Sequence, residues 1–179
     1  MLKIVSFAAA IIFCLNVSNK YQNDELISVA GIVSTIKKIL ILGIGNTLRG
    51  DDGIGAYVCN QVETMKMVNV ATHKVQQLQV ELLDMMIDFD RVLIVDAGIN
   101  VRKVIIEVVT DVTQPHASSH HSDPAVFKAL AKQLYQKDLN IYSCAIPVQS
   151  FEMGEGLTKF AEKNANEAVQ LIKDWCQSG

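Results

Sequence analysis

Apolar runs alternate with amphipathic stretches along this chain. Three of the runs, at 37–44, 91–97 and 139–148, consist mostly of apolar residues between polar borders. Such runs are typical of strands buried on both faces of a parallel sheet. A weaker alternation at 67–75 predicts another strand, and the run at 104–109 is short enough to pair as an antiparallel neighbour. The chain is therefore expected to form a mainly parallel sheet.

The stretches between these runs repeat their apolar residues at helical spacing. Asp51 or Asp52 is expected to cap the first helix by accepting its free N–H groups. Ser122 or Asp123 is placed to cap the third helix, and Thr158 the last. The expected apolar faces are Ile54, Val58, Val62 and Met65; Val80, Leu83 and Ile87 within 79–88; Phe127, Leu130 and Leu134 within 124–136; and Ala161, Ala165, Ala168, Ile172 and Trp175.

The predicted order of elements is β-α-β-α-β-β-α-β-α. Strands that alternate with helices indicate the α/β class. We expect one domain over residues 37–179, a three-layer sandwich in which a mainly parallel, twisted sheet has helices on both faces.

The first 36 residues do not fit this pattern. Lys3 precedes an apolar run at 4–15, which resembles the charged and apolar regions of a signal peptide. The run is too short to span a bilayer as a helix, and no clear small-x-small cleavage site follows it. We interpret 1–36 as a leader-like or poorly ordered extension, and favour a start codon placed too far upstream, or a loosely attached extension, over export.

Charge and cysteine content narrow the function classes. The 16 basic and 19 acidic residues give a formal net charge of −3, which lends no support to nucleic-acid or anionic-membrane binding. The chain has four cysteines, and none forms a C-x-x-C pair of the kind found in zinc knuckles or redox sites. Cys59 and Cys144 lie in apolar runs and are expected to be buried, reduced thiols.

The segment ILGIGNTLRGDDGIG, residues 41–55, joins the first strand to the first helix. A dinucleotide-binding turn has the pattern G-x-G-x-x-G, but Leu48 occupies the place of the third glycine. Asp51 and Asp52 would also repel a pyrophosphate from the start of the helix. A nucleotide-binding oxidoreductase therefore remains only the less favoured alternative.

The same acids are better suited to a cation. In open parallel sheets, ligands bind beyond the carboxyl ends of the strands. Asp52 follows the first strand, Asp96 ends the strand at 91–97, and the loop before the third helix carries His120 and His121. Two carboxylates and an imidazole suit a divalent metal such as nickel or zinc. The alternatives are a helix cap for the first acid and plain solvated histidines in the loop.

Four segments, in this order, resemble the hydrogenase maturation proteases. They are GIGNTLRGDDGIG, DFDRVLIVDAG, SSHHSDPAVFKALA and PVQSFEMGEGLT, and the similarity spans about Lys38 to Trp175. The resemblance implies an endopeptidase, acting in the cytoplasm, that removes a C-terminal peptide from the nickel-loaded large-subunit precursor of a nickel-iron hydrogenase. It also implies that Asp52, Asp96 and His120 bind the metal, with His121 as the alternative one position along.

The resemblance further implies that the nickel is carried by the substrate, and that zinc or cadmium could substitute in vitro. Gly45, Asn46 and Gly50 are expected to position the client segment. Hydrolysis could use a metal-activated water, or Asp52 or Asp96 as a general base of the aspartic type. A non-enzymatic nickel-binding or chaperone module of the same fold is the alternative function. We expect a monomer without nucleic-acid or membrane partners.

Overall fold

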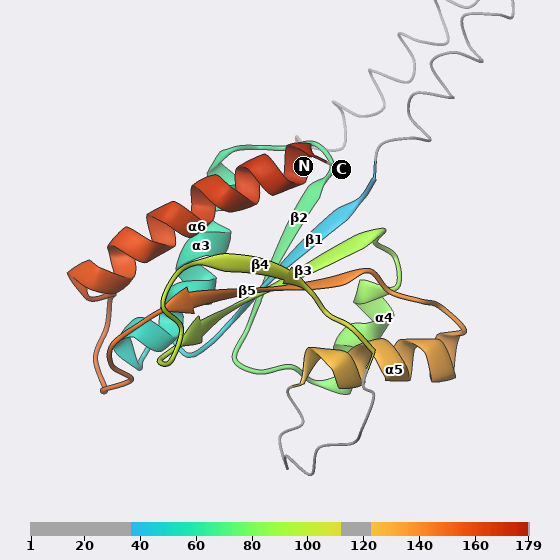
Figure 1. Ribbon diagram of the computed structural model, residues 1–179, viewed down its shortest axis with the longest axis horizontal. Coiled ribbons are helices and arrows are strands. Elements are labelled where there is room, and N and C mark those ends of the chain that lie inside the picture. Colours follow the sequence, from blue (N-terminus) through green and yellow to red (C-terminus); the bar gives the residue numbers. More distant parts are fainter. Residues whose placement is uncertain (1–36, 112–122, 179) are drawn as a thin grey trace, which may run out of the picture. The chain divides into compact units, whose positions relative to one another are not determined.

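The computed structural model describes residues 37–111 and 123–178, and these contain a five-stranded sheet of order β2-β1-β3-β5-β4. Strands β2, β1, β3 and β5 run parallel, and β4 is antiparallel to β5 (Figure 1). The strands are β1 (Ile39–Ile44), β2 (Val70–Val75), β3 (Arg91–Gly98), β4 (Ile105–Val108) and β5 (Ile141–Pro147). The mainly parallel sheet predicted from the apolar runs is confirmed.

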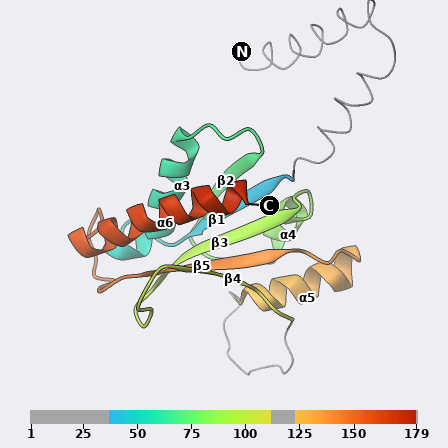
Figure 2. The same ribbon diagram turned by 45° about the horizontal axis from the view of Figure 1, so that its top comes forward.

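Helices cover both faces of this sheet, as Figures 1 and 2 show. Helices α3 (Ile54–Thr64) and α6 (Lys159–Gln177) lie on one face, and α4 (Leu83–Met86) and α5 (Pro124–Tyr135) on the other. Two short 3-10 turns, η1 (Gly50–Gly53) and η2 (Val80–Leu82), precede α3 and α4. The three-layer α/β sandwich is therefore confirmed for the described residues.

Burial of β3 on both faces explains why its sequence is a continuous apolar run. Leu93 and Val95 are buried in the core beneath α3 and α6, whereas Val92 and Ile94 are buried in the core beneath α4 and α5. Because successive side chains of a strand point to opposite faces, both sets must be apolar when both faces are covered. Asp96 comes directly after the last of these side chains and is exposed.

Two details of the predicted elements differ from the structure. The stretch at 79–88 is a 3-10 turn followed by a short α-helix, and the tighter winding leaves Val80 exposed while Leu83 is buried. In α5, Leu134 belongs to the exposed last turn, and the small residue Ala131 takes the buried place. The run at 104–109 contains β4, which pairs antiparallel as predicted, with β5 at the edge of the sheet.

Other predictions for the described residues are confirmed. Asp123 caps α5 by accepting a hydrogen bond from the Ala125 N–H, at 2.9 Å, and Pro124 follows as the first helical residue. Thr158 caps α6 in the same way, with its Oγ1 accepting from the Ala161 N–H at 3.2 Å. Within 37–111 and 123–178, no helix combines the length and the apolarity needed to cross a membrane.

The three cysteines of the described part, Cys59, Cys144 and Cys176, are buried free thiols, as the apolar runs predicted for the first two. Burial raises the pKa of Cys59 to about 11, of Cys144 to about 12 and of Cys176 to about 11. The thiolate is the reactive form, so these groups are expected to be unreactive near neutral pH.

We therefore predict that iodoacetamide at pH 8 modifies these three cysteines only slightly in the folded protein and fully in urea. Their pKa values lie well above 8 in the fold and return toward 9 on unfolding, which exposes thiolate. Peptide mass spectrometry measures each site separately, so that Cys14 does not confuse the result. Rapid alkylation of Cys144 in the native protein would contradict the burial of β5 between its covering helices.

Candidate functional site at the carboxyl edge of the sheet

Two aspartates lie where adjacent parallel strands end. Asp52 belongs to η1, which follows β1, and its Oδ2 accepts a hydrogen bond from the Asn46 N–H at 2.7 Å. Asp96 is exposed near the end of β3, and its Oδ1 accepts from its neighbour's backbone, the Ala97 N–H, at 2.8 Å. Because β1 and β3 are adjacent and parallel, both carboxylates are carried by the same edge of the sheet.

Glycines let the turn after β1 fold close against this edge. A Cβ on Gly55 would lie 2.3 Å from the Ile44 carbonyl oxygen and 2.8 Å from that of Val95. Gly45 has a φ of +128°, and a Cβ there would lie 1.7 Å from the carbonyl oxygen of Asp52. Any side chain at these positions would push the first turn of α3 away from the ends of β1 and β3. The glycines are thus needed to bring Asp52 toward Asp96.

The charge distribution supports this proximity. Partial desolvation raises the pKa of Asp96 although its side chain reaches the surface, and the negative charge of Asp52 raises it further. The hydrogen bond from the Ala97 N–H acts in the opposite direction and lowers this pKa. Two carboxylates that repel each other in this way favour either a proton or a cation between them.

Asp51 has a different environment from Asp52. Its side chain is 1% exposed and accepts hydrogen bonds from the Thr158 N–H at 2.7 Å, from the Thr158 Oγ1–H at 3.0 Å and from the Gln149 N–H at 3.4 Å. The prediction that Asp51 or Asp52 caps the first helix is therefore wrong. Gly53 holds the N-cap position of α3 without a side-chain bond, because η1 separates both acids from the free N–H groups of that helix.

The loop between β5 and α6 lies alongside the glycine turn. The Gly50 N–H donates to the Gly154 carbonyl at 2.7 Å, and the Gly154 N–H donates to the Leu48 carbonyl at 3.0 Å. Local sequence patterns contain nothing that pairs Gly154 with a turn about 100 residues earlier. The second wall of the site was therefore not predicted.

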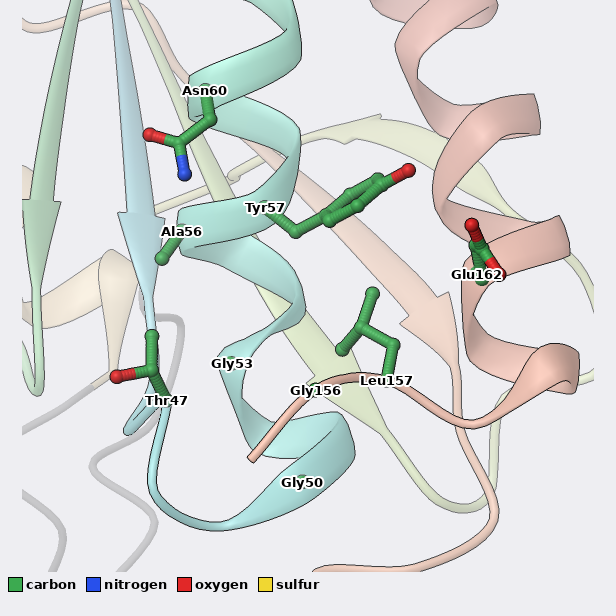
Figure 3. Close-up of a pocket in the computed structure, with 9 residues that line it drawn as sticks. All are labelled: Thr47, Gly50, Gly53, Ala56, Tyr57, Asn60, Gly156, Leu157 and Glu162. Carbon is green, nitrogen blue, oxygen red and sulfur yellow. The ribbon is translucent and has the colours of Figure 1, made fainter. Parts of the chain in front are cut away.

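A groove of about 350 Å³ begins at this junction (Figure 3). Gly50 and Gly53, which flank the two aspartates, line its floor. Figure 3 shows Tyr57 projecting from α3 toward α6, with Leu157 and Glu162 on the facing side. The complete lining is Thr47, Gly50, Gly53, Ala56, Tyr57, Asn60, Gly156, Leu157 and Glu162. Tyr57 and Leu157 offer apolar contacts to an occupant of the groove, and Thr47, Asn60 and Glu162 offer polar groups.

The predicted third metal ligand, His120, and its alternative His121 lie outside the described residues. Of the other predicted residues, Gly45, Asn46 and Gly50 all belong to the turn that holds Asp52. Within the described part of the chain, no group of three or more His, Cys, Asp or Glu side chains is close enough to hold a metal ion. Of the metal ligands predicted from the sequence, the described residues include Asp52 and Asp96.

Sequence comparison finds a distant relative with the same predicted activity. The protein of Methanocaldococcus jannaschii named "Putative hydrogenase maturation protease MJ0253" is 26% identical over 149 residues, which cover 76% of this chain and 94% of that protein. No family model matches the chain.

Solved structures of maturation proteases have a similar fold. HycI from Thermococcus kodakarensis KOD1, described as a [NiFe] hydrogenase maturation protease, has a TM-score of 0.64 at 19% identity and covers 84% of this chain and 99% of its own. The hydrogenase maturating endopeptidase HybD from E. coli has a TM-score of 0.63 at 23% identity, over 79% of this chain and 94% of its own. At these identities, the structures support the fold.

We predict that Gly55→Ala lowers the free energy of unfolding by about 2–3 kcal/mol, because the new methyl group meets the carbonyls of Ile44 and Val95. Alanine normally stabilises a helix relative to glycine by about 1 kcal/mol. A loss of stability in Gly55→Ala would therefore indicate the steric clash and not the ordinary helix effect. Urea denaturation gives the measurement. The variant Ala129→Gly, at an exposed position of α5, is the control and measures the ordinary difference in stability between alanine and glycine in a helix of this protein. A Gly55→Ala variant that is more stable than wild type would contradict the close approach of Gly55 to Ile44 and Val95.

Proposed function

We propose that this chain, a hydrogenase maturation protease by sequence and fold resemblance, is an endopeptidase that removes a C-terminal peptide from a nickel-loaded hydrogenase large subunit. The observation that carries the proposal is the placing of Asp52 and Asp96 at one edge of the sheet, close enough for the charge of one to raise the pKa of the other. The resemblance assigns metal binding to these same two acids.

The nickel would arrive as part of the substrate. Each carboxylate has one oxygen engaged by a backbone N–H, from Asn46 or Ala97, and in the described residues no donor occupies the other oxygen. Desolvation raises the pKa of Asp96, and the negative charge of Asp52 adds to this effect. A divalent cation between these oxygens would relieve the repulsion between the two acids. His120 is the proposed third donor and would complete a mixed oxygen and nitrogen set suited to nickel.

Recognition of the metal would restrict cleavage to precursor that already holds nickel. A precursor without nickel would present no cation to two carboxylates that repel each other, so it would bind weakly. A loaded precursor would dock with its metal at the acids and its C-terminal segment close to the glycine turn. We further propose that the groove of Figure 3 receives part of this segment, since it begins at Gly50 and Gly53 on either side of the acids.

Hydrolysis itself requires an activated water. A nickel ion lowers the pKa of bound water when it is present. The alternative on the protein side is that Asp52 or Asp96 accepts a proton from water as a general base. Asn46 and the backbone of the turn would hold the peptide segment while this occurs.

We predict that Asp52→Ala and Asp96→Ala each reduce cleavage of nickel-loaded precursor by at least about 100-fold, because each variant removes a metal ligand. The assay incubates purified full-length protein with large-subunit precursor, with and without nickel, and detects the released C-terminal peptide by mass spectrometry. His73→Ala, which changes an exposed residue of β2, is the control and should leave the rate unchanged.

Two results would count against this function. Cleavage by Asp52→Ala at the wild-type rate would remove the acids from the mechanism. Tight, nickel-dependent binding of the precursor without any cleavage by the wild-type protein would instead support the nickel-binding module.

A separate comparison identifies the imidazole ligand. His120→Ala is expected to reduce cleavage about as much as Asp96→Ala, because both variants would remove a metal ligand. His121→Ala should change cleavage less than about threefold, because a solvated histidine does not bind the metal. Nickel affinity of the two variants, measured by isothermal titration calorimetry, should follow the same order. The reverse order would identify His121 as the ligand. Wild-type cleavage and nickel affinity in both variants would show that neither histidine belongs to the site.

A further inference from the structure

We propose that Asp51 is a positioning residue that fixes the glycine turn and the loop at 149–158 as one unit, and thereby sets where Asp52 lies. The inference rests on the proposed function of Asp52 as a metal ligand. It separates the tandem acids into two roles, with Asp52 facing the metal and Asp51 acting only through the backbone and Thr158.

The contacts of Asp51 reach both ends of the loop. Gln149 is the loop's first residue and Thr158 its last, and both donate to the same carboxylate, at 3.4 Å and at 2.7 Å for the backbone N–H groups. The Thr158 hydroxyl adds a third hydrogen bond at 3.0 Å. One buried side chain thus closes a loop whose middle is held separately, through Gly154, to Gly50 and Leu48.

A carboxylate is better suited to this place than a neutral side chain. All three contacts come from donors, and only a carboxylate offers acceptors on both of its oxygens. No Lys or Arg of the described residues forms an ion pair with Asp51. Its charge instead faces the start of the 19-residue helix α6, whose free N–H groups favour a negative charge.

The Thr158 hydroxyl links this contact to the helix. It donates to Asp51 at 3.0 Å and accepts from the Ala161 N–H at 3.2 Å, so one hydroxyl both caps α6 and anchors the turn. Loss of the hydroxyl would remove its bond to Asp51 and the cap of α6, and would loosen the loop, while the backbone N–H groups of Gln149 and Thr158 still donate to Asp51. This makes Thr158 the sharper position for a test, because the site's own ligands are not changed.

The consequence concerns Asp52 and the groove together. Asp52 is the next residue in η1, so a turn that is free to move would let its carboxylate move relative to Asp96. Gly156 and Leu157 belong to the same loop and form one wall of the groove. Removing the anchor is therefore expected to weaken metal binding and client binding at once.

The test uses the full-length protein and four variants, one of which is a control. Thr158→Val and Asp51→Ala should each raise the Kd for Ni²⁺ alone by about 10-fold or more, as is usual when support for a metal ligand is lost. Thr158→Ser keeps the hydroxyl and should stay within about twofold of wild type. Asp90→Ala is the matched control: Asp90 accepts a 2.7 Å hydrogen bond from the distant Lys38 N–H, but at the opposite edge of the sheet.

Hydrogen exchange provides a readout that needs neither metal nor client. The Gly50 and Gly154 amides, which bond across the junction, should exchange faster in Thr158→Val than in wild type or Thr158→Ser. If Asp51→Ala does not fold, the Thr158 pair alone decides. Unchanged exchange in Thr158→Val would overturn the proposal. So would wild-type Ni²⁺ affinity in a folded Asp51→Ala variant, because Asp52 would then be held in place without Asp51.

The outcome also separates this proposal from the proposed function. A wild-type protein that cleaves no precursor would refute the protease, yet the exchange rates would still report on the anchor. Conversely, wild-type cleavage and Ni²⁺ affinity in Thr158→Val would refute the positioning role and leave the protease standing. In the precursor assay, a positioning role predicts a raised KM and a lowered kcat for Thr158→Val, and both should recover in Thr158→Ser.

Discussion

The close approach of three backbone segments determines the geometry of the candidate site. A Cβ on Gly43 would lie 2.3 Å from the Gly55 carbonyl, and one on Gly55 would lie equally close to Ile44 and 2.8 Å from the Val95 carbonyl oxygen. Helix α3 therefore begins in direct backbone contact with the ends of β1 and β3. The placing of Asp52 near the end of β3 depends on this contact being free of side chains.

This contact also explains how adjacent aspartates come to differ. Residues of a 3-10 turn project about 120° apart, so two consecutive side chains cannot share one environment. Asp51 points into the molecule and meets the loop before α6, whereas Asp52 lies at the partly exposed side of the turn and bonds to Asn46. The pair looks redundant in the sequence, but the fold assigns the two acids different partners.

The limits of the sequence prediction have a physical origin. The apolar runs predicted β1, β3 and β5 because burial on both faces leaves a local pattern, and strand order then brought Asp52 and Asp96 to one edge. The contact of the loop at 149–158 with the glycine turn was missed because its hydrogen bonds to Asp51 span 98 and 107 residues, which no local pattern encodes. The helix-cap prediction for the acids was wrong for the same reason: their strongest partners are distant in sequence or belong to the turn itself.

The repulsion between Asp52 and Asp96 has a cost for the stability of the fold. Neighbouring carboxylates destabilise each other in the absence of a cation, so the fold must hold them by contacts that do not involve the metal. The backbone bonds from Asn46 and Ala97, the glycine contacts and the buried Asp51 are contacts of that kind. An acid pair prepared in this way has the properties expected of a sensor for a metal that arrives with another protein, as the proposed protease requires.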